Sequence, residues 1–318
     1  MYTIGVDLGG TNTAAAIFDK DFNLLGRGNL STRSDVSPEG VANSIELACR
    51  EALKACSLDF SDISGIGIGS PGIIDPENGV IEYWSRYDFR AVPMAQMVSA
   101  RTGKRVYMDN DANAAALGEF IAGAGKGSRD MVAVTLGTGI GGGAVIGGKL
   151  YSGFNHAALE LGHMGIALGG KKCTCGRSGC FEAYASVTAL IEQTRDAMQA
   201  HPESAMWRFA PTLDKVDGRT SFDAMRAGDE AAKQVVEQYM DFLAYGFANI
   251  INIFQPEVLC VGGGISNERE TLFAPVRERL AKEDYARSLS KRTRLVRAEL
   301  GNDAGLYGAA ALVPRDQA

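Results

Sequence analysis

The chain has 318 residues, of which 46% are hydrophobic and 22% are charged, and its formal net charge at pH 7 is −6. These values are typical of a globular protein with about two domains and a sizeable buried core. The acidic balance disfavours nucleic acid as a partner, and the lack of any apolar run of roughly 20 residues disfavours a membrane partner.

In the first part of the chain, short β-rich runs alternate with turns and helical segments. Strands are predicted over residues 3–6, 14–18, 24–27, 63–68 and 105–108. Ser37 followed by Pro38 predicts a helix start, because serine caps well and proline fits the first position. Apolar side chains at helical spacing predict its buried stripe, which consists of Val41, Ile45, Ala48 and Ala52. A helix rich in small residues is predicted over 112–122.

The same plan of strand, glycine turn, strand, turn and strand starts again at Met131. Strands are predicted over residues 131–136, 144–146 and 149–151. When the two parts of the sequence are aligned, Asp7–Thr11 corresponds to Thr135–Gly139. This repetition indicates two related α/β halves around a cleft. Farther on, a strand is predicted over 258–261 and helices over 186–200, 229–255 and 304–312. We expect the last helix to fold back onto the first domain.

Three glycine-rich turns each follow an apolar strand. They contain Gly9, Gly10 and Thr11 in the first turn, Gly137, Thr138 and Gly139 in the second, and Gly262, Gly263 and Gly264 in the third. Glycine lets the backbone approach a ligand and point successive N–H groups at phosphate oxygens. A single turn of this kind is more simply a tight turn, but two in matching positions of a repeat indicate a nucleotide site. None matches the P-loop or the dinucleotide-binding pattern.

Acidic side chains stand where two predicted strands end. Asp7 lies beside the first glycine turn, where a carboxylate can hold Mg²⁺ next to nucleotide phosphates or, alternatively, only cap its own turn. Asp109, Asn110 and Asp111 lie where a strand enters a helix, and each of them, Asp109 for example, could alternatively serve only as the helix cap. A carboxylate at this place can take the proton of a sugar hydroxyl, and the helix N-terminus favours its ionised form.

The strongest local pattern joins His163 to three cysteines, Cys173, Cys175 and Cys180. Three thiolates and one imidazole complete a tetrahedral zinc shell with no open position, so the zinc is expected to be structural. The alternative is a set of reduced thiols without metal. The first ten residues do not form a signal peptide, and clustered cysteines in an unexported chain favour a metal site, so we expect a cytoplasmic protein.

Two glutamates, Glu160 and Glu182, flank this cysteine loop in the sequence. Folding the loop onto zinc would bring both carboxylates toward one place. Carboxylates accept strong hydrogen bonds, which suits sugar hydroxyls. Without the zinc argument, two solvated glutamates would be the simpler interpretation.

Together these segments resemble the ROK family of repressors, open reading frames and sugar kinases, and within it the bacterial glucokinases. The resemblance rests on Asp7–Thr11, Asn110–Asn113, Glu160–His163, Cys173–Glu182 and, near the end of the chain, 303–310. It implies an α/β fold of the actin-like ATPase (ribonuclease H-like) class, with two domains around a central cleft. The expected smaller domain comprises residues 1–119 with 303–318, and the larger one comprises 120–302.

The resemblance also implies an activity, which is transfer of the γ-phosphate of ATP to the 6-hydroxyl of glucose with Asp111 as general base. It assigns sugar binding to Asn110, Asp111, Glu160, His163 and Glu182. It assigns ATP and Mg²⁺ to Asp7, Asn12 and the three glycine turns, with Gly262–Gly264 near the adenosine. It further implies structural Zn²⁺ and a homodimer or homotetramer.

Three positions depart from the family pattern. His156 and Leu159 stand where the family often has glycine or another small residue, and Asn12 stands where many relatives have lysine. A kinase for N-acetylmannosamine, allose or fructose therefore stays open as an alternative. A repressor would need a DNA-binding module before the first strand, for which a start at Thr3 leaves no room. A non-catalytic sugar sensor would be expected to lack Asp111 or the glycine turns.

Overall fold

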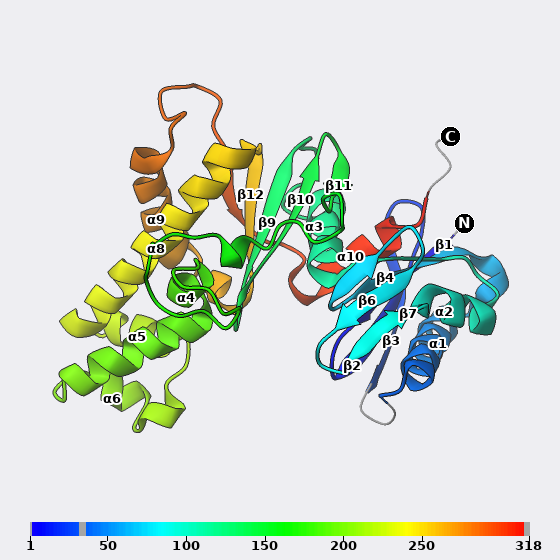
Figure 1. Cartoon of the computed structure of the whole chain (residues 1–318), viewed down its shortest axis with the longest axis horizontal. Helices are drawn as coiled ribbons and strands as arrows, with labels where there is room; N and C mark the ends of the chain where they lie inside the picture. Colours follow the sequence, from blue (N-terminus) through cyan, green and yellow to red (C-terminus); the bar gives the residue numbers. More distant parts are fainter. Residues whose placement is uncertain (1, 32–35, 315–318) are drawn as a thin grey trace. The chain divides into compact units, whose positions relative to one another are not determined.

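The computed structural model describes residues 2–31 and 36–314 (Figure 1). The chain divides into two compact units, the first formed by Met1–Met131, Gly143–Leu159 and Glu299–Ala318, and the second by Val132–Gly142 and Glu160–Ala298. The predicted domain boundaries stay a prediction. Within the part of the chain that is described, no helix is both long and apolar enough to cross a membrane.

The first unit is built on a five-stranded sheet with the order β3-β2-β1-β4-β8. Its strands are β1 (Tyr2–Leu8), β2 (Asn12–Phe18), β3 (Leu24–Ser31), β4 (Ile63–Ser70) and β8 (Val106–Asn110). β1 and β4 run parallel, as do β4 and β8, and Asp7, Gly69 and Asp109 stand in one row across them. Because parallel strands end at the same edge of a sheet, Asp7 and the start of the helix after β8 share that edge.

The second five-stranded sheet repeats this order as β11-β10-β9-β12-β13. Its strands are β9 (Met131–Leu136), β10 (Ile140–Ile146), β11 (Lys149–Tyr151), β12 (Val258–Gly262) and β13 (Arg294–Arg297). The equal order of two sheets in one chain confirms the predicted internal repeat. β10 begins at Ile140 rather than at Ala144, because Gly141–Gly143 continue the strand instead of the turn.

The helices of the first unit cover its sheet. They are α1 (Pro38–Ala55), α2 (Met94–Thr102), α3 (Asp111–Ala122) and α10 (Ala304–Ala311), with the 3₁₀ turns η1 (Phe60–Asp62) and η5 (Gly301–Asp303). Ser37 caps α1 by accepting a hydrogen bond from Gly40 N, and the whole predicted stripe of α1 is buried. In α10, Leu306 and Ala310 pack against Phe18, so the last helix does fold back onto the first sheet.

A small antiparallel sheet was not predicted from the sequence. It consists of β5 (Ile73–Asp75), β6 (Val80–Trp84) and β7 (Phe89–Val92). Trp84 and Phe89 are buried in the core and contact each other edge to face, while Glu82 and Arg90 are exposed. Three such short strands carry too few apolar residues for periodicity to reveal them.

The second unit adds a helical layer, in which α8 and α9 pack side by side (Figure 1). The helices are α4 (Glu182–Ala185), α5 (Val187–Ala200), α6 (Met206–Phe209), α7 (Thr220–Arg226), α8 (Glu230–Phe254) and α9 (Glu270–Glu283). The 3₁₀ turns are η2 (Leu161–His163), η3 (Leu213–Lys215) and η4 (Gly264–Glu268). α8 ends where Gln255 turns to a φ of 44°, directly before Pro256.

One carboxylate joins segments that are distant in the sequence. Glu119 in α3 is only 3% exposed, and its oxygens accept hydrogen bonds from Ala124 N at 3.0 Å, Glu299 N at 3.1 Å and Leu300 N at 2.8 Å. Bonds to an ionised acceptor are the stronger ones. Glu119 therefore ties the segment that leaves α3 to the segment that leads into α10.

Candidate active site

The first glycine turn and the acidic residues lie together in the first unit. Asp7 is the residue before the end of β1, and Gly9 N in the following turn donates a hydrogen bond to Asn12 O at 2.8 Å. Within the described residues, the Asp7 side chain accepts no hydrogen bond from its own turn, so it does not act as a cap there. Its carboxylate instead faces Gly305, at the start of α10.

Of the three residues that the sequence offered as a cap of α3, Asn110 is the one that caps it, and Asp109 does not. The Asn110 amide oxygen accepts hydrogen bonds from Ala112 N and Asn113 N, and its amide nitrogen donates to Gly72 O at 3.0 Å. Asp109 is buried and accepts from the Asn113 side chain at 2.8 Å, because its side chain points into the unit rather than over the helix end. The Asn110 amide nitrogen carries a second hydrogen besides the one that it donates to Gly72 O.

Asp111 is the first residue of α3, and it interacts electrostatically with Asp7. Burial raises the pKa of Asp111 above its ordinary value, against the opposing effect of the Ala112 N–H that it accepts. Burial first, and the charge of Asp111 second, raise the pKa of Asp7 from 3.8 to about 6. Two carboxylates that repel each other at one sheet edge suit a cation between them, or a proton held by one of them.

The raised pKa of Asp7 predicts a pH-dependent gain in stability on its replacement. The folded protein holds this proton between pH about 4 and about 6, whereas the unfolded chain releases it near 3.8, so the free energy of unfolding falls as the pH rises through this window. In magnesium-free buffer, Asp7→Asn should raise the free energy of unfolding at pH 8 by up to about 3 kcal/mol, and at pH 4 by far less.

Urea denaturation of the variant and of the wild type at both pH values checks this prediction. Asp21→Asn, which removes an exposed carboxylate from the same unit, is the matched control and should change little at either pH. An equal effect of Asp7→Asn at pH 4 and pH 8 would show that the Asp7 charge is not the cause.

Arg86 is a candidate site residue that the sequence analysis missed. A Cβ atom added to Gly10 would lie 2.8 Å from Arg86 Cδ and 2.9 Å from its Nη1, so the guanidinium group stands directly over the first glycine turn. The neighbouring Tyr87 hydroxyl donates to Gly10 O at 2.6 Å. A guanidinium group over N–H groups that could face phosphate suits an anionic ligand. No spacing pattern could have indicated it, because Arg86 comes from an irregular turn between β6 and β7.

The second unit brings the four predicted zinc ligands together. One donor atom from each of His163, Cys173, Cys175 and Cys180 lies within 4.8 Å of the other three. The Cys175 and Cys180 sulfurs are 3.7 Å apart, and Cys173 Sγ lies 3.6 Å from His163 Nδ1. Tetrahedral Zn–S and Zn–N bonds would separate these pairs by about 3.8 and about 3.6 Å. The residues therefore fit Zn²⁺, with Nδ1 as the nitrogen that faces the metal.

Both predicted sugar-binding glutamates lie beside this cluster. Glu160 directly precedes η2, the turn that ends in His163, and its carbonyl oxygen accepts the His163 N–H at 2.9 Å. Glu182 Oε1 lies 3.8 Å from Cys173 Sγ, and its Oε2 accepts Ile140 N at 2.8 Å. Glu182 thus joins the cysteine loop to the strand that follows the second glycine turn.

The second and third glycine turns meet within the second unit. Gly263 has a φ of 91°, and a Cβ atom on it would lie 2.0 Å from Leu136 O, so no other residue fits there. A Cβ atom added to Gly137 or to Gly264 would have no atom beyond its chain neighbours within 4 Å, so the space beside both glycines is open. The second turn is held by α5, whose Val187 N–H and Thr188 hydroxyl donate to Gly137 O and Thr138 O.

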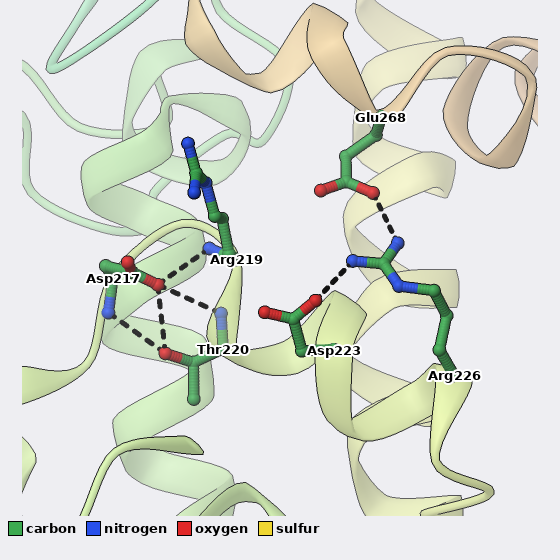
Figure 2. Close-up of polar contacts among 6 residues, drawn as sticks. All are labelled: Asp217, Arg219, Thr220, Asp223, Arg226 and Glu268. Carbon is green, nitrogen blue, oxygen red and sulfur yellow. Dashed lines mark hydrogen bonds and ion pairs between the residues drawn. The ribbon is translucent and has the colours of Figure 1, made fainter.

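The third glycine turn continues into η4, which an arginine network holds from the helical layer (Figure 2). Arg226, at the end of α7, donates to Glu268 at 2.6 Å and to Asp223 at 2.5 Å. Glu268 is the last residue of η4, and its side chain is only 12% exposed. The position of the backbone around Gly264 therefore depends on a helix that is distant in the sequence.

Two of the residues that depart from the family pattern have an unusual backbone conformation. His156 has a φ of 59° and Leu159 a φ of 67°, both in the left-handed region. This conformation costs a residue with a Cβ atom roughly 1–2 kcal/mol, whereas glycine adopts it freely. The strain explains why glycine suits these positions.

Comparison with known proteins places this arrangement in a family. The family model described as "ROK family" matches residues 3–316. A glucokinase from Thermotoga maritima is 39% identical over 98% of this chain and 96% of its own length. A crystal structure of a ROK family glucokinase from Streptomyces griseus in complex with glucose and AMPPNP has a TM-score of 0.79 at 34% identity, covering 98% of this chain and 99% of that one.

A second structure, of a ROK hexokinase from Thermus thermophilus, has a TM-score of 0.82 at 34% identity and covers 98% of both chains. Such likeness along almost the whole chain confirms the α/β fold of the actin-like ATPase class. With its two matching sheets and with the family model spanning nearly every residue, the chain belongs to the ROK family.

Proposed function

We propose that this chain is an ATP-dependent sugar kinase that transfers the γ-phosphate of ATP to the 6-hydroxyl of glucose. The observation that carries the proposal is the pairing of Asp111, at the N-terminus of α3, with Asp7 beside the first glycine turn. The relatives named glucokinase support glucose as the acceptor, and the nucleotide analogue AMPPNP in the S. griseus complex supports ATP as the donor.

In this proposal, Asp111 acts as the general base. Its carboxylate takes the proton of the sugar O6–H while O6 attacks the γ-phosphorus, and the bond from that phosphorus to the bridging oxygen of ADP breaks. The electron pair of the broken bond stays on ADP. Burial raises the proton affinity of Asp111, which favours proton transfer as the hydroxyl becomes acidic in the transition state.

The proposed sugar contacts are made by one amide, two glutamate carboxylates and one imidazole. Asn110 offers its remaining amide hydrogen, and Glu160 offers carboxylate oxygens as acceptors. Because Nδ1 of His163 faces Cys173 Sγ, Nε2 is the nitrogen available to a hydroxyl, and a bound zinc ion would fix the orientation of the ring. Glu182 contributes through Oε1, since its Oε2 already accepts Ile140 N.

The proposed nucleotide contacts are backbone groups. The first two glycine turns would donate N–H groups to the phosphates, and Gly262–Gly264 would lie near the adenosine. Asp7 would hold Mg²⁺, which when bound neutralises phosphate charge. The expected homodimer or homotetramer and the cytoplasmic location belong to the same proposal.

A coupled ADP-release assay over a panel of hexoses tests the proposed function. With Mg·ATP in excess, glucose should give the highest kcat/KM among glucose, N-acetylmannosamine, allose and fructose. If another hexose were phosphorylated and glucose were not, the assignment of glucose as the acceptor would be wrong, but the assignment of kinase activity would stand. Sugar binding without ADP release from any member of the panel would make the chain a sugar sensor instead.

A further inference from the structure

A cavity of about 340 Å³ lies in the second unit, away from the glycine turns. Its wall comes from α9, from the end of α8 and from the segment that enters β13. Arg294 pairs with Val258 at the start of β12, whereas the third glycine turn follows the other end of that strand. Four residues of strand separate the two places by roughly 13 Å, so the cavity is distinct from the proposed nucleotide site.

The wall of this cavity carries a surplus of positive charge. Three arginines line it, Arg277, Arg292 and Arg294, against a single carboxylate, Asp284. The surplus of two charges stands out on a chain whose net charge is −6. Guanidinium groups that converge on a concave surface are the usual means of recognising phosphate or carboxylate groups.

The internal pairing of these groups leaves guanidinium donors free. Asp284 is 3% exposed, and its Oδ2 accepts from Arg292 Nε at 3.2 Å and from Nη2 at 3.1 Å. Arg277 donates Nε to Leu295 O at 3.2 Å and Nη1 to Glu270, whose side chain is 70% exposed and does not line the cavity. Within the described part of the chain, no side chain pairs with the Arg294 guanidinium group. Arg277 Nη2, Arg292 Nη1 and all of Arg294 therefore remain available.

The rest of the wall is apolar, and it includes Ile251, Leu280 and Leu295. The volume falls in the range of sites for small molecules, roughly 300–1,000 Å³, which leaves room for an organic part beside an anionic group. We propose that this cavity binds a small phosphate monoester, with its phosphate on Arg294, Arg277 and Arg292 and its carbon skeleton against the apolar wall. The proposal does not depend on the kinase activity.

Calorimetric titration of the zinc-loaded full chain with glycerol 2-phosphate, at 150 mM salt, tests the proposal. Arg294→Gln should weaken binding about 10-fold, the equivalent of one lost charge-assisted hydrogen bond. Lys291 lies three residues before Arg294, and its side chain does not line the cavity. Lys291→Gln removes the same charge and should change the affinity less than about 2-fold. Because both side chains are exposed, both variants should keep the wild-type thermal midpoint.

The comparison of the two variants decides the outcome. Weaker binding of glycerol 2-phosphate by Arg294→Gln, with unchanged binding by Lys291→Gln, supports the site. Equal weakening by both variants would mean long-range attraction without a site, and equal affinity of Arg294→Gln and wild type would place the ligand elsewhere, for example at the glycine turns. Either of these results, or no measurable binding to the wild type, overturns the proposal.

Discussion

Asp111→Asn should lower kcat by at least about 10²-fold while changing the KM for ATP little, because an amide cannot take the proton of the attacking hydroxyl. Since burial raises the pKa of Asp111, the acid limb of the wild-type kcat profile should lie above the range of an ordinary aspartate. The measurement is steady-state ADP release as a function of pH.

Asp88→Asn is a suitable control for this variant. It removes a carboxylate from the same unit, but Asp88 is exposed and forms a surface ion pair with Arg90. Its rate should stay within about 2-fold of the wild type, as expected for the loss of an exposed ion pair. Near-normal turnover by Asp111→Asn would remove Asp111 as the base.

Cys175→Ser should have the largest effect on stability, because it removes one of four zinc ligands. The wild type should contain about one zinc per chain, and the variant far less. Because the zinc site forms only in the folded chain, zinc binding contributes directly to folding, and the free energy of unfolding should fall by about 4 kcal/mol or more in the variant. Elemental analysis and denaturant unfolding measure the two effects.

Cys56→Ser is the matched control for the zinc variant. Cys56 lies outside the cluster, where its thiol donates to Ala52 O at the end of α1, a bond that serine can also make. It should keep its zinc and lose little stability. A fully active wild-type preparation without metal, or an equal loss of stability in both variants, would contradict a structural zinc site.

The parts of the fold that could be predicted are those in which the local pattern and the tertiary environment agree. β9 matches its predicted range and α1 buries the stripe that its spacing indicates, because a buried strand and an amphipathic helix leave strong signals in the sequence. β11 also matches its predicted range, although it is a short antiparallel strand with exposed side chains. A run of glycines did not distinguish a turn from a strand. Gly141–Gly143 form a strand although glycine disfavours one, since the neighbouring strand decides their conformation.

The candidate site was predictable only where its residues are near in the sequence. The four predicted zinc ligands lie within residues 163–180 and form one cluster, as their spacing predicted. Arg86 reaches Gly10 from an irregular turn, and Arg226 reaches Glu268 from another helix, so neither contact leaves a sequence pattern. The sequence left the cap of α3 open because Asp109 and Asn110 are both good caps, and the register of β8 decides between them.

The most direct test is a crystal structure of this chain with glucose and AMPPNP bound. We expect an Asp111 carboxylate oxygen within about 3.2 Å of the glucose O6, the reach of a general base, with Glu160 and His163 on the other hydroxyls of the same sugar. A glucose molecule whose O6 points away from Asp111, with that carboxylate in solvent, would contradict the assignment on which the proposed reaction depends.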